Sequence, residues 1–190
     1  MDRSCLYFDF LRTEGSVYIV ITGQPGAGKT NVAIALANRL QAQGENCFLL
    51  HTDILKVTLR QLGVQELQGI STGEDVDCRL QTIRPYLVRQ YEKALHDGYH
   101  IIVEGTLAVG FAPSSSGLYL DLVASEQTCN QRIQKKHISA RESLVSRHSF
   151  AQYQLVLEKY RPEKAIVLDA EKTIFSLVEQ IYELFLEKIR

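Results

Sequence analysis

The chain lacks the features that mark membrane-spanning, secreted and nucleic-acid-coating proteins. No apolar run approaches the roughly 18 to 20 residues that a helix needs to cross a bilayer, and charged residues scattered through the N-terminal segment do not form a signal-peptide layout. The four cysteines lie far apart and form no C-x-x-C pair, so neither a disulfide framework nor a zinc site is expected. The formal net charge of -1 provides no basic field for nucleic acid. These absences predict a cytoplasmic protein that binds neither membrane nor nucleic acid.

What the chain does contain is the composition of one folded domain. Of its 190 residues, 45% are hydrophobic and 23% are charged, a balance typical of a globular protein with a sizeable core. Apolar runs alternate with segments of helical periodicity after residue 15, whereas the first residues hold only a short apolar cluster. We therefore predict an N-terminal extension at residues 1–15 and a single domain at residues 16–190.

The most specific pattern is Gly-Gln-Pro-Gly-Ala-Gly-Lys-Thr at residues 23–30. It matches the phosphate-binding motif G-x-x-x-x-G-K-[ST], and its context fits, because the apolar run 17–21 precedes it and a helical pattern at 31–43 follows it. Glycines let successive backbone N–H groups turn toward phosphate oxygens, and the positive end of the following helix adds to the attraction. The chain is therefore predicted to bind a nucleoside triphosphate.

Two residues of this motif have predicted tasks of their own. Lys29 supplies a positive charge for the β- and γ-phosphates, and the hydroxyl of Thr30 is placed to ligate Mg²⁺. ATP and Mg²⁺ are therefore the predicted cofactors. The residues predicted to bind the nucleotide are Gly23, Gln24, Pro25, Gly26, Ala27, Gly28, Lys29, Thr30, Asn31 and Arg132.

Strands and helices are predicted to alternate along the whole domain. The predicted strands lie at 17–22, 47–50, 101–105, 118–124 and 165–169. The predicted helices lie at 31–43, 54–62, 76–96, 125–137, 150–160 and 173–189. Residues 63–77 and 106–117 are predicted to be loops, and Pro85 predicts a kink or break near Arg84. This alternation predicts an α/β fold with a parallel sheet covered by helices on both faces.

Two acidic residues come at the carboxyl ends of predicted strands, where ligands of such sheets bind. Asp53 follows the second strand, and it could act as a general base for an attacking hydroxyl or cap the helix that begins at Ile54. Glu104 ends the third strand, in the layout of a Walker-B acid. It could ligate Mg²⁺ together with Thr30, orient the acceptor, or be a buried structural acid.

Basic residues gather after the fourth predicted strand. Arg132 lies on the predicted helix, and Arg141 and Arg147 lie in or beside a polar segment at about 137–149. Such a segment could be a lid whose arginines stabilise a migrating phosphoryl group, or simply a solvated surface. The earlier arginines could bind an anionic acceptor or pair with nearby acids. These arginines are Arg60, Arg79 and Arg84, and the acids are Glu66, Glu74, Asp75 and Asp77.

The four patterns together resemble the P-loop kinases that phosphorylate small molecules, among them the zeta-toxin, chloramphenicol phosphotransferase and gluconate-kinase-like members. The resemblance is carried by GQPGAGKT at 23–30, HTDILK at 51–56, IIVEGT at 101–106 and the basic segment at 132–147. It implies a three-layer fold with a five-stranded parallel sheet in the order 2-3-1-4-5 and a lid after the fourth strand. It also implies that Asp53 is the general base.

We therefore predict a phosphotransferase that moves the γ-phosphate of Mg-ATP to a hydroxyl of a small molecule. Its predicted catalytic residues are Lys29, Asp53, Arg141 and Arg147, and its predicted metal ligands are Thr30 and Glu104. One alternative is a nucleotide-dependent switch that grips a protein partner through Leu107, Val109 and Phe111 in the 106–117 loop. A nucleic-acid end kinase is less favoured because the charge is nearly balanced. The protein is expected to be a monomer or homodimer.

Overall fold

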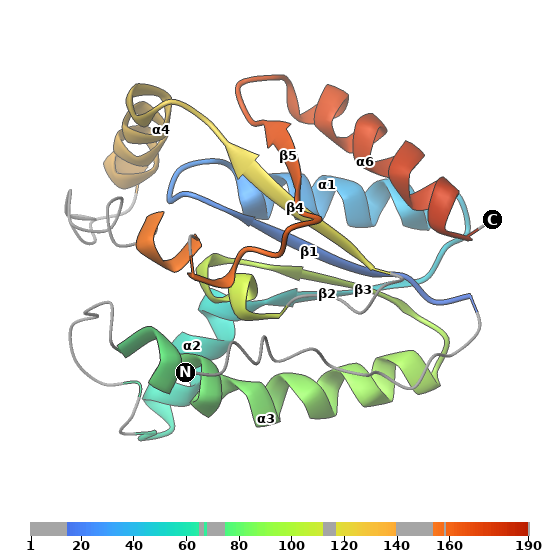
Figure 1. The fold of residues 1–190 in the computed structure, drawn as a ribbon, viewed down its shortest axis with the longest axis horizontal. Helices are drawn as coiled ribbons and strands as arrows, with labels where there is room; N and C mark the ends of the chain where they lie inside the picture. The colour runs from blue at the N-terminus through green and yellow to red at the C-terminus, as the bar shows by residue number, and fades with distance from the viewer. Residues whose placement is uncertain are drawn as a thin grey trace.

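The computed structural model describes residues 15–64, 67, 75–111, 117–139, 154–157 and 159–189, with the backbone alone for residues 75–77 and 136–139. Within these ranges the chain forms a central sheet between two layers of helices (Figure 1). Residues 1–14 of the predicted N-terminal extension at 1–15 and most of the predicted lid at 137–149 lie outside the described residues.

The centre of the fold is a five-stranded sheet in the order β2-β3-β1-β4-β5. Every neighbouring pair of strands is parallel. The strands are β1 (Tyr18–Gly23), β2 (Cys47–His51), β3 (His100–Glu104), β4 (Leu118–Val123) and β5 (Ile166–Asp169). The predicted fold class and strand order are therefore confirmed. The strand order changes direction beside β1, which places a crevice at the carboxyl ends of the central strands.

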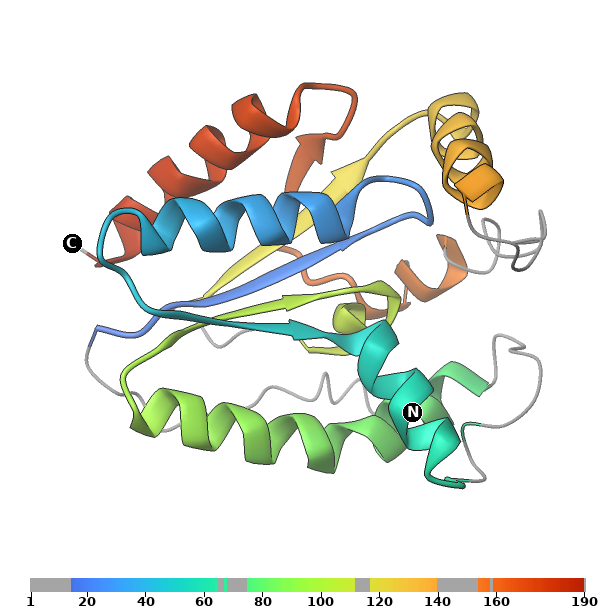
Figure 2. The same ribbon diagram turned by 180° about the vertical axis from the view of Figure 1, so that it is seen from behind.

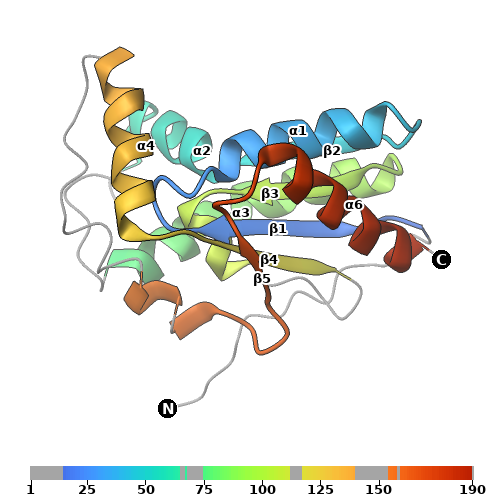
Figure 3. The same ribbon diagram turned by 90° about the horizontal axis from the view of Figure 1, so that it is seen from above.

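Helices cover both faces of this sheet. On one face lie α1 (Lys29–Gln41) and α6 (Ile174–Ile189), and on the other lies the long helix α3 (Asp75–His96) (Figure 2). The helices α2 (Thr52–Gln61) and α4 (Glu126–Ser139) follow the carboxyl ends of β2 and β4, so both begin at that end of the sheet (Figure 3). Residues 154–157 and 159–160 are also helical.

Alternating side chains of the strands build one core on each face of the sheet. Ile19 and Ile21 of β1 belong to the core under α1 and α6, together with Leu36 and Phe185. The intervening Val20 belongs to the other core. The buried members of α3 in that second core recur at helical spacing, and they are Leu80, Ile83, Leu87, Tyr91 and Ala94. Burial of both faces explains why the strands read as continuous apolar runs.

Three details differ from the predictions. Residues Thr106–Gly110 form a 3-10 helix, η2, rather than the start of a loop. Its apolar side chains, Leu107 and Val109, and the following Phe111 are buried in the second core. The surface on which the partner-binding alternative depended is therefore absent. The helix α3 continues through Pro85 as one element, so a break near Arg84 is wrong.

Within the described part of the chain, no helix combines the length and apolar character needed to span a membrane.

Candidate nucleotide and metal site

The phosphate loop connects the end of β1 to the start of α1, as the motif predicted. Gly23, Gly26 and Gly28 have positive φ angles of 148°, 85° and 97°. A Cβ atom on Gly23 would lie 2.5 Å from the carbonyl oxygen of Leu122, and one on Gly26 would lie 2.5 Å from that of Cys129. The loop therefore needs glycine for two reasons, because its backbone is left-handed and because neighbouring main chain is in close contact with it.

Lys29 is the first residue of α1 and is buried beneath this loop. Its Nζ donates hydrogen bonds to the carbonyl oxygens of Gly23, at 2.9 Å, and Gln24, at 3.0 Å. The loop closes on itself through a bond from the Ala27 N–H to the same Gln24 carbonyl. The ammonium group is therefore held at the inner edge of the cradle by the backbone that forms it.

Thr30 connects the loop to the neighbouring strand. Its Oγ1 donates a hydrogen bond of 3.1 Å to Oε2 of Glu104, the last residue of β3. The other carboxylate oxygen, Oε1, lies 2.6 Å from Nδ1 of His51, the last residue of β2. Glu104 is only 3% exposed, so these two bonds hold a buried carboxylate.

This arrangement fits a magnesium ion but not a closed protein cage. A hydroxyl and a carboxylate are the hard oxygen ligands that Mg²⁺ prefers. Among the described residues, no group of three or more His, Cys, Asp or Glu side chains could hold a metal by itself. Magnesium is commonly bound by one or two protein ligands together with phosphate oxygens and water. The chemistry of Thr30 and Glu104 therefore suits a metal that arrives with a nucleotide.

Asp53 lies at the same edge of the sheet, in the first turn of α2. The helix starts at Thr52 with His51 at the N-cap position, so the idea that Asp53 caps a helix beginning at Ile54 is wrong. The Asp53 side chain is 50% exposed, and its Oδ1 lies 3.1 Å from Nζ of Lys56, one turn later. A carboxylate at this place is reachable from solvent and stabilised by the positive end of the helix.

Arg132 of α4 forms a hydrogen bond to the phosphate loop. Its guanidinium donates to the carbonyl oxygens of Ala27, at 3.2 Å, and Ala170, at 2.8 Å. Arg141 and Arg147 lie outside the described residues. The remaining predicted nucleotide contacts are the half-buried Pro25 and the exposed Asn31.

The sequence model of one known family matches this chain. The family is described as Zeta toxin, and the match covers residues 8–116, more than half of the chain. The chain belongs to the zeta toxin family. No curated protein matches its sequence.

Solved structures share the fold of this zeta toxin family member. The protein APE1195 is 22% identical with a TM-score of 0.59, and the alignment covers 94% of this chain and 99% of that one. A sugar kinase from Janibacter sp. HTCC2649 is 21% identical with a TM-score of 0.57, covering 90% and 95%. A candidate kinase of Chloroflexus aurantiacus is 20% identical with a TM-score of 0.56, covering 93% and 100%. Family and fold together are those of a P-loop kinase-type phosphotransferase.

One charged residue of this zeta toxin family member was missed by the sequence reasoning. Asp121 lies in β4 beside Thr22, is 1% exposed, and has Oδ2 at 3.6 Å from Nε of Arg161. Burial raises the pKa of Asp121, while the positive charges of Arg161 and Lys29 act in the opposite direction. The available signal was an acid inside the otherwise apolar run at 118–123.

The structure describes only part of the surroundings of Arg60, Arg79 and Arg84, the arginines that could bind an anionic acceptor. Arg60 donates from Nε to the carbonyl oxygen of Leu67, and Arg79 is buried on α3. Two of the expected acidic partners, Glu66 and Glu74, lie outside the described residues. The same holds for the side chains of Asp75 and Asp77. Both alternatives for these arginines, binding of an anionic acceptor and pairing with acids, therefore stay predictions.

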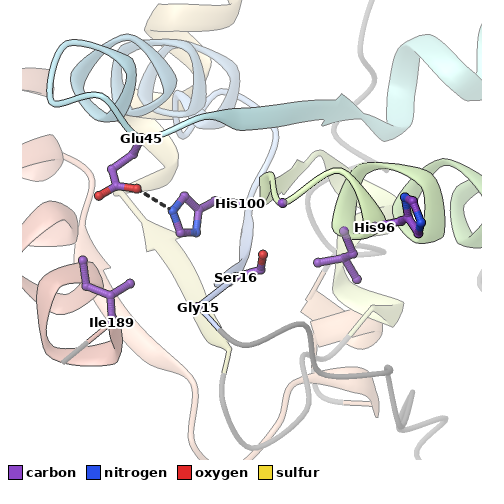
Figure 4. Close-up of a pocket in the computed structure, with 8 residues that line it drawn as sticks. Gly15, Ser16, Glu45, His96, His100 and Ile189 are labelled. Atoms are coloured by element: carbon purple, nitrogen blue, oxygen red, sulfur yellow. Dashed lines mark hydrogen bonds and ion pairs between the residues drawn. The ribbon is translucent and has the colours of Figure 1, made fainter.

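A cavity of about 400 Å³ lies at the opposite edge of the sheet, where β1 and β3 begin (Figure 4). Inside it, Nδ1 of His100 accepts the Val17 N–H at 3.0 Å, and Nε2 lies 2.9 Å from Oε2 of Glu45. The ring therefore carries a hydrogen on Nε2, and this N–H donates a hydrogen bond to the Glu45 carboxylate. Because the phosphate loop is at the carboxyl end of β1, this cavity is not the nucleotide site of the zeta toxin family member.

Proposed function

We propose that this protein is a kinase that transfers the γ-phosphoryl group of Mg-ATP to a hydroxyl group of a small molecule. The observation that supports this most is the hydrogen bond between Thr30 in the phosphate loop and the buried Glu104 at the end of β3. It brings two magnesium-type ligands together beside a motif for phosphate binding. Asp53 follows the adjacent strand β2, so an acid that could act as a base lies at the same edge.

The phosphate loop and its lysine would bind and orient the nucleotide. Backbone N–H groups of the loop and the positive end of α1 attract the phosphates. Lys29 would exchange its two carbonyl partners for β- and γ-phosphate oxygens, which bear more negative charge. Thr30 and Glu104 would hold the magnesium ion, which supplies neutralising charge to the phosphates when bound.

Asp53 would take the proton of the attacking hydroxyl. As that oxygen forms its bond to the γ-phosphorus, the proton moves to a carboxylate oxygen of Asp53 and the bond from the γ-phosphorus to the oxygen of ADP breaks. The carboxylate is half exposed, so an acceptor can reach it from solvent. Nζ of Lys56 donates a hydrogen bond to Oδ1 of this carboxylate and holds it in place.

Arginines that follow β4 would complete the site. Arg132 donates a hydrogen bond to the carbonyl oxygen of Ala27 in the loop, so its positive charge would lie beside a bound nucleotide. Arg141 and Arg147 would approach the transferring phosphoryl group from the segment after α4 and exclude water from it.

The proposal is tested by following γ-phosphate transfer from ATP to a panel of sugars, polyols, nucleosides and aromatic alcohols. We expect transfer to at least one class, and we expect Asp53→Asn to lower the rate about 100- to 10,000-fold because a positioned base is lost. The affinity for Mg-ATP should not change. Asp97→Asn is the matched control, because Asp97 is also paired with a lysine, Lys93, but follows the last residue of α3.

Full activity of Asp53→Asn on the accepted substrate would rule out Asp53 as the base. Binding of Mg-ATP without transfer to any alcohol would contradict the kinase proposal itself. An oligonucleotide with a free terminal hydroxyl belongs in the same panel, since transfer to it alone would show a nucleic-acid kinase instead.

A further inference from the structure

His51 lies at one end of a chain of hydrogen bonds that crosses three elements. Its Nδ1 is 2.6 Å from Oε1 of Glu104, and Oε2 of the same carboxylate accepts the hydroxyl hydrogen of Thr30 at 3.1 Å. A carboxylate can only accept hydrogen bonds, so Nδ1 of the ring carries the proton. The chain therefore connects β2 to β3, and β3 to the first turn of α1.

The backbone fixes where the imidazole can lie. His51 and Glu104 are directly opposite each other in the parallel pairing of β2 with β3. The next residues are also packed tightly, because a Cβ atom on Gly105 would collide with Oγ1 of Thr52. Gly105 has a φ of 125°, so this close approach depends on glycine. The two strand ends and the residues that follow them therefore lie close together.

A glutamate used as a metal ligand needs such support. Its side chain has several rotatable bonds, and a buried carboxylate without hydrogen-bond donors is costly. The bond from His51 occupies one oxygen and leaves the other directed at Thr30. The Thr30 hydrogen points to the carboxylate, so the lone pairs of that hydroxyl oxygen are available for a cation.

We propose that His51 is a positioning residue for magnesium, which holds Glu104 in the orientation that forms an oxygen pair with Thr30. This rests on the proposed function, in which these two residues meet the metal of the nucleotide. His51 is 21% exposed and Glu104 is 3% exposed, so the imidazole holds a carboxylate that is almost fully removed from water. Partners of this kind typically change metal affinity 10- to 100-fold.

The test measures metal binding rather than turnover. Binding of Mn²⁺ to the complex of the protein with ADP is followed by electron paramagnetic resonance, and ADP affinity without metal is measured separately in EDTA. We expect His51→Phe to weaken Mn²⁺ binding about 10- to 100-fold with unchanged ADP affinity in EDTA. His51→Asn should stay within about threefold of the wild type, because its amide nitrogen can take the place of Nδ1.

His96→Phe is the matched control. His96 also contacts a carboxylate, that of Asp97 at 3.3 Å, but it is 85% exposed and lies at the end of α3. We expect it to bind Mn²⁺ and ADP as the wild type does. If His51→Phe does not fold, His51→Gln replaces it, because the longer amide does not overlay Nδ1 and should lose at least about tenfold in affinity.

Several results would overturn the proposal. Equal Mn²⁺ affinity in the wild type and the folded His51→Phe variant would do so. Equal Mn²⁺ affinity in His51→Asn and His51→Gln would also overturn it. A loss of metal-free ADP affinity as large as the loss of Mn²⁺ affinity would show a general structural role. Failure of Asp53→Asn to slow transfer would contradict the proposed base while leaving these metal measurements interpretable.

Discussion

The two ends of the sheet carry the same chemical pair, a histidine with a glutamate, in opposite arrangements. At the carboxyl end the Glu104 carboxylate is buried and the His51 ring is partly exposed. At the amino end the His100 ring is buried and the Glu45 carboxylate is partly exposed. A buried carboxylate that also bonds Thr30 is suited to a cation, whereas a buried ring between a backbone N–H and an acid is suited to holding strands together.

The first way to test this comparison is to neutralise each glutamate in turn. We expect Glu104→Gln to lower magnesium-dependent ATP turnover by about 100-fold or more, because a neutral amide holds the metal and its charge poorly. We expect Glu45→Gln to leave turnover unchanged. Steady-state assays with and without added acceptor measure both, and equal effects of the two variants would show that the two ends do not differ in function.

The second test compares two left-handed glycines, one at each end. Gly26→Ala places a Cβ 2.5 Å from the Cys129 carbonyl oxygen, so the phosphate loop must shift. We expect nucleotide affinity to fall about tenfold or more, together with a strain of about 1–2 kcal/mol. Gly98 has a φ of 78°, and a Cβ atom added there would meet no atom within 4 Å. We therefore expect Gly98→Ala to cause the backbone strain alone, without a loss of nucleotide affinity. Calorimetric titration with ADP and thermal unfolding separate the two effects.

The third test concerns the amino-end pair alone. His100→Phe keeps a ring against Phe185 but leaves the buried Val17 N–H without its acceptor. We expect the free energy of unfolding to fall by about 1–3 kcal/mol, with no change in metal affinity. His100→Asn can accept the same N–H through its amide oxygen and should recover most of the loss. Urea denaturation decides this, and unchanged stability of the Phe variant would remove the structural role.

The smallest expected effect is at Asp121. Burial raises its folded pKa, so the folded protein binds this proton more tightly than the unfolded chain does. Its contribution to stability is therefore full below the unfolded pKa of about 3.9 and is lost as pH rises through the folded pKa. Asp121→Asn cannot lose a proton, so we expect a flatter pH profile of unfolding and a stability change within about 1 kcal/mol at neutral pH.

Asp97 offers a control of opposite sign for that experiment. A hydrogen bond from Lys93, helped by one from His96, lowers the pKa of Asp97, so its contribution is present above the unfolded pKa and is lost as pH falls through the folded pKa. Thermal unfolding at a series of pH values is measured for Asp121→Asn and Asp97→Asn. If both substitutions changed the slope of stability against pH in the same direction, the assignment at Asp121 would be contradicted.

Much of the phosphate loop and its flanking strand and helix could be predicted from the sequence, because the residues that specify them are consecutive. The eight-residue motif at 23–30, with a strand before it and a helix after it, specified the loop and the positions of Lys29 and Thr30. The parallel α/β class followed from the alternation of strands and helices. The strand order was expected from resemblance rather than from the residues, because no local pattern says which strands become neighbours.

The regions of η2, α2 and β4 were less predictable, because their places depend on contacts between segments distant in the sequence. Residues 106–111 contain small and apolar residues that suit either a loop or a buried turn, and only packing under α3 turned them inward. Asp53 was correctly placed after β2, but its position inside the first turn of α2 depended on where the helix started. Asp121 was overlooked although its charge interrupts an apolar strand.

The sequence by itself determined that this chain has a phosphate loop and which lysine and hydroxyl belong to it, since those residues are consecutive and need no distant partner. The tertiary structure decided that Glu104 lies between His51 and Thr30. Those three residues are separated by 21 to 74 positions, and only the parallel register of β2 with β3 beside α1 brings their side chains within hydrogen-bond distance.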